Sequence, residues 1–90
     1  MSVKINIHVE LQHLTNEQAS VEVDGSTVGE CLDNLVSLYP DLKKSLFDDE
    51  GNLVTYIEIY VNLESTYPEE LNYPVKDGDE IHITIVNVGG

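Results

Sequence analysis

Basic residues are scarce in this sequence. Four basic residues stand against seventeen acidic ones, which gives a formal net charge of −13 at pH 7. A charge of that sign repels phosphate backbones and anionic lipid heads, so we expect no nucleic acid and no membrane among the partners. The negative field favours encounter with a basic protein surface, although it serves solubility equally well.

Cysteine and long apolar runs are also scarce. The single Cys31 cannot form an internal disulfide, so nothing in the sequence requires an oxidising compartment. No apolar run approaches the roughly 20 residues of a membrane span, and the first residues alternate where a signal peptide would be continuously apolar. We expect a soluble, cytoplasmic protein with one domain, 1–90, because 90 residues support a single modest core.

Polar and apolar residues alternate in four stretches, and this period of two predicts four strands that each bury one face. The stretches are Val3–Val9, Ala19–Val23, Ile57–Val61 and Ile81–Ile85. The first two should form a hairpin with a loose loop between them. We expect the first and last strands to pair in parallel at the centre of the sheet.

A helix is predicted to begin at Thr27. Thr27 and Glu30 form a capping box, in which the Glu30 carboxylate can reach back to the Thr27 amide. The helix should end at Tyr39, because Pro40 disfavours the α conformation of the residue before it, and a short turn or helix should follow. Apolar residues at intervals of three and four predict one buried stripe. This stripe consists of Val28, Leu32, Leu35, Tyr39 and Leu42, with Cys31, Leu38 and Leu46 close to it. A helix on one face of a mixed sheet is an α+β architecture of two layers.

Two further segments are predicted to be loops. The segment 63–76 is irregular, and Leu71 and Val75 should hold it to the core. The run Asp48-Asp49-Glu50 gathers three carboxylates, but its spacing does not fit a calcium-binding loop. We interpret it as a solvated turn.

The chain ends in Gly89 and Gly90, directly after a β-branched run. Glycine has no side chain to pack and a large backbone entropy, which predicts a flexible tail on a rigid strand. The missing Cβ atoms let a partner enclose the backbone and reach the terminal carboxylate, and activation of that group by ATP is a natural use. A frayed terminus without function is the alternative.

Four motifs occur in the order and at the spacing of a known family. They are Thr27-Val28-Gly29-Glu30-Cys31-Leu32 leading to Tyr39-Pro40, Ile59-Tyr60-Val61-Asn62, Val75-Lys76-Asp77-Gly78-Asp79-Glu80-Ile81, and Gly89-Gly90. Over nearly its whole length the chain resembles the ubiquitin-like, β-grasp sulfur carriers of the MoaD/ThiS type, which include the thiamine-biosynthesis carrier and the small subunit of molybdopterin synthase. The residues Leu46-Phe47-Asp48 and Gly51-Asn52-Leu53 look most like the carriers that serve cysteine or methionine synthesis.

The resemblance implies a β-grasp fold, with a mixed sheet of about four to five strands and one main helix on one face. It also implies that an E1-like adenylyltransferase uses ATP to adenylate the Gly90 carboxylate, and that a sulfur donor converts the adenylate to a thiocarboxylate. A sulfur-accepting biosynthetic enzyme would then receive the sulfur, for cysteine or methionine, molybdopterin or thiamine. The chain itself would be a carrier that binds no cofactor and is not an enzyme, unless it is counted as the small subunit of one.

Site residues follow from the resemblance and from the strand pattern. Gly90 would carry the reacting atom, and Gly89 and Val88 would give access to it. The phase opposite the core predicts an exposed sheet face for docking. Its residues are Tyr60, His82, Thr84 and Val86, with Asn6 and His8 beside them. Scattered exposed side chains are the alternative interpretation of that face. Asn87 stands where family tails carry an apolar residue, which bears on the choice of partner.

One cysteine and three histidines are the other candidate nucleophiles and metal ligands in the sequence. Cys31 could relay sulfur, but a cysteine on the apolar side of a helix is more often a small core residue. His8, His13 and His82 show no metal-binding spacing, so we expect surface histidines and no metal.

Two other functions stay open at this point. A ubiquitin-like modifier would join Gly90 to lysines of target proteins, and it would begin with the same adenylate. A plain interaction module would have an inert tail.

Overall fold

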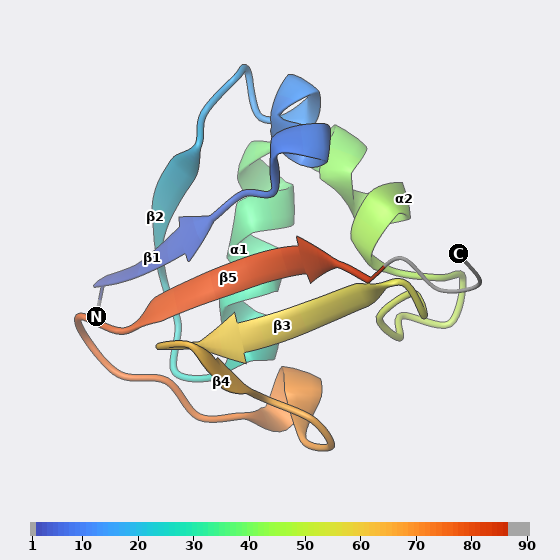
Figure 1. Ribbon diagram of the computed structural model, residues 1–90. Helices are drawn as coiled ribbons and strands as arrows, with labels where there is room; N and C mark the ends of the chain where they lie inside the picture. Colours follow the sequence, from blue (N-terminus) through green and yellow to red (C-terminus); the bar gives the residue numbers. More distant parts are fainter. Residues whose placement is uncertain (1, 87–90) are drawn as a thin grey trace.

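The structure is a computed structural model that describes residues 2–86 of the chain (Figure 1). Five strands form one sheet in the order β2-β1-β5-β3-β4. The strands are β1 (Ser2–Asn6), β2 (Ser20–Asp24), β3 (Ile57–Val61), β4 (Glu64–Ser65) and β5 (Glu80–Ile85). The α-helices are α1 (Val28–Leu38) and α2 (Lys43–Leu46), and the 3-10 helices are η1 (Val9–Leu14), η2 (Pro40–Leu42) and η3 (Glu70–Asn72). Within residues 2–86, no helix is long and apolar enough to cross a membrane.

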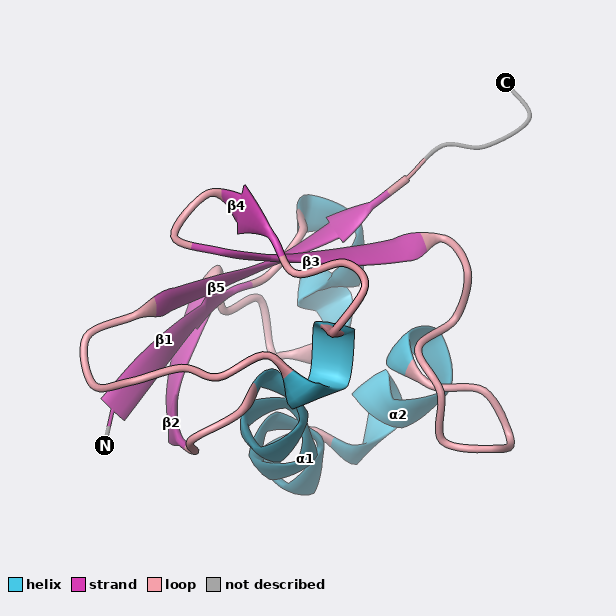
Figure 2. Cartoon of the chain, turned by 90° about the horizontal axis from the view of Figure 1, so that it is seen from below, coloured by secondary structure: helices cyan, strands magenta, loops and turns pink. Residues whose placement is uncertain are grey.

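The predicted central pairing of the first and last strands is confirmed. β1 and β5 run parallel with Ile5 opposite Ile81, while β2 pairs antiparallel with β1 as the predicted hairpin. β3 pairs antiparallel with the other side of β5, and β4 follows it at the edge. Figure 2 shows α1 and α2 on one side of this mixed sheet. The α+β architecture of two layers is therefore confirmed.

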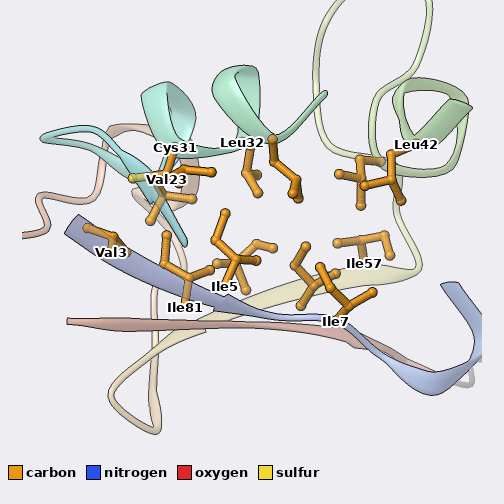
Figure 3. Packing of buried hydrophobic residues seen from close by; sticks show 14 of the residues in the cluster. Val3, Ile5, Ile7, Val23, Cys31, Leu32, Leu42, Ile57 and Ile81 are labelled. Atoms are coloured by element: carbon orange, nitrogen blue, oxygen red, sulfur yellow. The ribbon is translucent and has the colours of Figure 1, made fainter. Parts of the chain in front are cut away.

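The core lies between the sheet and α1. Figure 3 shows Ile5 and Ile81 of the sheet facing Leu32 of the helix. All three side chains are fully buried, and Cys31 is buried with them. Burial raises the pKa of the Cys31 thiol to about 11. Its burial confirms Cys31 as a core residue. A thiol that is buried and protonated at neutral pH is also a poor nucleophile, which argues against a role in relaying sulfur.

The first strand is shorter than predicted. It ends at Asn6, and Val9, which was assigned to the buried face, begins η1 with 71% of its surface exposed. The connection to β2 is also not a loose loop, because Leu11 and Thr15 are buried in it. The Thr15 hydroxyl donates to the carbonyls of Gln12 (3.2 Å) and Gln18 (2.9 Å). A buried hydroxyl with two acceptors fixes the turn, a contact that strand periodicity does not show.

The start of α1 keeps one half of the predicted capping box. Thr27 Oγ1 accepts from the Glu30 amide at 3.1 Å, as predicted. The Glu30 carboxylate binds Ser26 instead of the Thr27 amide, accepting from both the amide and the hydroxyl of Ser26 at 2.8 Å. These two bonds hold the pKa of Glu30 below its usual value. The predicted end at Tyr39 is confirmed, but Leu38 is 58% exposed and does not belong to the buried stripe.

The segment 63–76 is more ordered than predicted. It holds β4 and η3, and it is tied to β3 by the buried Thr66, whose amide (3.1 Å) and hydroxyl (2.8 Å) both donate to the Ile59 carbonyl. Val75 is buried and Leu71 packs at the edge of the core, as predicted. A Cβ at Gly29 would lie 3.0 Å from the Leu71 carbonyl oxygen, which explains why glycine suits that position of α1.

Two of the sequence motifs meet where β5 begins. The Asn62 side chain donates to Asp79 Oδ1 (3.0 Å) and accepts from the Glu80 amide (3.0 Å), while the Lys76 amide donates to Asp79 Oδ2 (2.9 Å). The Asn62 and Lys76 bonds hold the pKa of Asp79 below its usual value. The two motifs therefore form one network that fixes the start of β5 against the end of β3.

We expect Leu32→Ala to lower the free energy of unfolding by about 2–5 kcal/mol, because it removes a fully buried side chain from the core. Leu38→Ala, on the same helix, should change it by less than about 0.5 kcal/mol. Urea unfolding followed by circular dichroism measures both. Equal losses in the two variants would contradict the exposed position of Leu38.

We expect Asp79→Asn to lower the free energy of unfolding by about 1–3 kcal/mol at neutral pH, because the amide cannot accept both hydrogen bonds. The pKa of Asp79 is lower in the folded chain, so its contribution is present above the unfolded value of about 3.9 and is lost as the pH falls through the folded value. The difference from wild type should therefore shrink in acid. Urea titrations across this range measure it, with the exposed Asp33→Asn as control. A difference that stays constant with pH would argue against the network.

Candidate functional site

The C-terminal tail follows the central strand of the sheet. β5 is hydrogen-bonded on one side to β1 and on the other to β3. After the strand, the Val86 amide donates to the Tyr56 carbonyl at 2.7 Å. The predictions on Asn87, Val88, Gly89 and Gly90, including the flexible tail, fall on 87–90, outside the described residues. The structure describes the chain that leads into them, β5 and Val86, which we call the stem of the tail.

The side of the sheet opposite α1 carries a row of polar side chains. Asn6, His82 and Tyr60 lie opposite one another on β1, β5 and β3, and Thr84 lies opposite Glu58 in the next row. All five side chains are half-buried, whereas Ile81 and Ile83, which alternate with them on β5, are buried in the core. We call Asn6, Glu58, Tyr60, His82 and Thr84 the sheet face. The structure therefore brings together four of the six residues predicted for this face, Asn6, Tyr60, His82 and Thr84.

The sheet face is polar and has carboxylates near its aromatic centre. A hydrogen bond to the Glu58 side chain raises the pKa of Tyr60, and the negative charge of Glu58 raises it further. The Thr84 hydroxyl donates to the Glu58 carbonyl (2.8 Å), and the side-chain Nδ2 of Asn6 donates to Glu80 Oε1 (3.2 Å). Such a surface offers an aromatic contact together with negative charge. Both suit a partner with basic groups.

Two predicted members lie away from this face. β1 ends before His8, whose Nδ1 accepts from the Glu10 amide at 3.1 Å and so caps η1. Val86 follows β5 and lines a groove at the edge of the sheet instead. Between residues 2 and 86, no three His, Cys, Asp or Glu side chains lie close enough together to hold a metal ion.

The groove beside Val86 was missed by sequence reasoning. It has a volume of about 540 Å³, and its apolar walls are formed by Leu53, Val54, Ile57, Tyr67 and Val86. Tyr67 is 74% exposed, although it lies in a segment that was predicted only as an irregular crossover. Four tyrosines other than Tyr67 occur in the chain. No local sequence pattern distinguishes Tyr67 from the other tyrosines.

The chain is similar to proteins of a known family. The ThiS family model matches residues 5–90. The chain belongs to the ThiS family. Because the match runs to residue 90, it includes Gly89 and Gly90.

Two proteins named CysO are among its relatives. The sulfur carrier protein CysO of Mycobacterium tuberculosis is 31% identical over 93 residues, which cover all of both chains. CysO in the crystal structure of the Amycolatopsis orientalis BexX/CysO complex is 35% identical, with a TM-score of 0.88 over 98% of this chain and 99% of that one.

A third relative carries a different name. SAMP1, the small archaeal modifier protein 1 of Haloferax volcanii, is 29% identical in its crystal structure, with a TM-score of 0.86 over the whole of both chains. These likenesses confirm the resemblance to the ubiquitin-like carriers and the β-grasp fold. One relative of this ThiS family member is thus named as a sulfur carrier, a second shares its name CysO, and the third is named as a modifier.

We expect Glu58→Ala to lower the pKa of Tyr60 toward that of an ordinary tyrosine, because it removes both the hydrogen bond and the negative charge that raise it. NMR titration of the Tyr60 ring carbons, assigned with a Tyr60→Phe variant, measures this shift. Glu69→Ala, which removes an exposed carboxylate elsewhere, is the control. An unchanged Tyr60 titration in Glu58→Ala would contradict this geometry of the sheet face.

Proposed function

We propose that this ThiS family member is a sulfur carrier whose reacting atom is the carboxyl carbon of Gly90. The observation that supports this most is the family match through residue 90, together with a Gly-Gly end that follows the central strand. The relatives named CysO support the same class of function. The sulfur would serve the synthesis of cysteine or methionine, molybdopterin or thiamine.

The chemistry requires activation, because a carboxylate is a poor electrophile. In the first step the Gly90 carboxylate attacks the α-phosphorus of ATP on an E1-like adenylyltransferase, and pyrophosphate leaves. A sulfur donor at the oxidation level of hydrosulfide then attacks the acyl carbon. The bond to AMP breaks, a carbon–sulfur bond forms, and a proton is released to leave a C-terminal thiocarboxylate. The chain acts as substrate and carrier, and its partners supply the catalysis.

The partners of the proposed carrier would dock around the stem of the tail. We assign Tyr60, His82 and Thr84 of the sheet face to this contact, with Val86 and Asn87 leading into the partner's channel. Gly89 and Val88 would lie in that channel and give access to Gly90. The structure of a CysO bound to BexX supports binding of a partner protein by a carrier of this type. The required partners are the adenylyltransferase, the sulfur donor and the sulfur-accepting enzyme, which we place in the cytoplasm.

The second candidate is a modifier that forms an isopeptide bond between Gly90 and lysines of target proteins. The similarity to SAMP1 favours it. Both functions share the adenylate, so they differ in the nucleophile that replaces AMP. The product on Gly90 therefore distinguishes them.

We expect alkylation of Gly90 when the protein, purified from its own host, is treated with a thiol-alkylating reagent under native conditions. Cys31 should stay unmodified, because it is buried and its pKa is raised to about 11. Mass spectrometry of the C-terminal peptide measures the modification.

A Cys31→Ala variant excludes any alkylation of the core thiol, and a variant without Gly90 is the control for the tail. An unmodified Gly90 in the alkylated protein would overturn the sulfur carrier. A Gly90 joined to target lysines, without any thiocarboxylate, would favour the modifier instead.

A further inference from the structure

The groove beside Val86 has two walls that are held in place by hydrogen bonds. Thr66 ties the Tyr67 wall to β3 through its two bonds to the Ile59 carbonyl. The opposite wall is fixed where the Val54 amide donates to the Leu46 carbonyl (2.9 Å) and the Ile57 amide donates to the Val54 carbonyl (3.1 Å). The groove is therefore formed before anything binds, as recognition sites usually are.

The groove also lies directly beside the stem of the tail. Ile57, which lines the groove, pairs with Ile85 at the end of β5, and Val86 is also part of the lining. Figure 1 shows the start of β3 running beside the end of β5. A partner that follows the tail from Val86 onward thus passes the groove as well as the sheet face.

The chemistry of the groove defines its occupant. Its apolar walls suit one aliphatic or aromatic side chain, and the exposed Tyr67 is of the residue type that dominates interface energies. Glu58 and Glu70 are also part of its lining and add negative charge. A second copy of this chain, at a formal charge of −13, would be repelled, whereas basic groups would be attracted.

We propose that the groove binds a segment of the partner protein in which an apolar side chain is flanked by arginine or lysine. The apolar side chain enters between Leu53 and Tyr67, and the basic groups contact Glu58 and Glu70. This inference rests on the proposed function for the role of the partner, which is the protein that handles the tail. It adds a contact site at the edge of β3, which adjoins the sheet face and shares Glu58 with it.

The test uses the full-length chain labelled with nitrogen-15 and a synthetic peptide in which one leucine is flanked on both sides by arginines. The amide signals of Tyr67, Glu70 and Val86 should shift on titration. Replacing leucine by serine in the peptide should weaken binding by more than about tenfold, because the buried apolar area is lost. Equal binding of the two peptides, or shifts confined to other parts of the chain, would overturn the proposal.

Matched charge variants separate this site from general attraction. Glu58→Gln with Glu70→Gln should weaken binding by about three- to tenfold. Glu64→Gln with Glu69→Gln makes the same change of net charge on side chains that do not line the groove, and it should weaken binding by less than about twofold. Equal losses in the two variants would show non-specific attraction and overturn the proposal.

A variant truncated after Val86 completes the test. It should bind the peptide as tightly as the full-length chain, and tighter binding would mean that the chain's own tail occupies the groove, which overturns the proposed occupant. Peptide binding requires no reaction at Gly90. A failed groove and a failed sulfur carrier are therefore distinguished by different measurements.

Discussion

The parallel pairing of β1 with β5 is the constraint on which the rest of the structure depends. It places the strand that leads into the tail between two neighbours, with Ile5 and Ile81 opposite each other in the core. A central strand has hydrogen-bonding partners on both sides, so it resists local opening better than an edge strand does. The last described hydrogen bond, from Val86 to Tyr56, extends this support beyond the strand. A reactive group that follows such a stem would be attached to a strand whose own position is fixed.

The two ends of β5 have different tasks. At its start, Asn62 and Asp79 join two of the four motifs that supported the family resemblance. Their side chains bond to each other and to the backbone amides of Lys76 and Glu80. These motif residues therefore maintain the fold. Toward its end lie the sheet face and the groove, whose side chains we propose as the contacts for a partner. The resemblance in these motifs therefore indicates the fold. Only the terminal glycines point to the function.

Much of the architecture could be predicted from the sequence, because period-two alternation and one amphipathic helix determine which residues are buried. The same reasoning failed where a tertiary contact overrides the local pattern. Val9 continues the alternation of β1, yet His8 caps η1 and turns the chain away from the sheet. Leu38 has the spacing of the buried stripe, yet it lies in the last turn of α1, where the chain turns toward η2. The Tyr67 wall depends on the hydrogen bond from Thr66 to the Ile59 carbonyl seven residues earlier, which neither strand nor helix periodicity indicates.

The charge of the chain links solubility with recognition. With −13 distributed over 90 residues, a single carboxylate at the surface carries little information about binding. Carboxylates that border apolar surface do indicate a binding site. A basic partner is attracted by the overall negative charge, but its affinity increases further only if it also buries an apolar group. Among the described residues, the groove beside Val86 combines both features next to the stem of the tail. Long-range attraction would then bring basic partners to the chain, and the apolar contact beside the stem would select those that align with the tail.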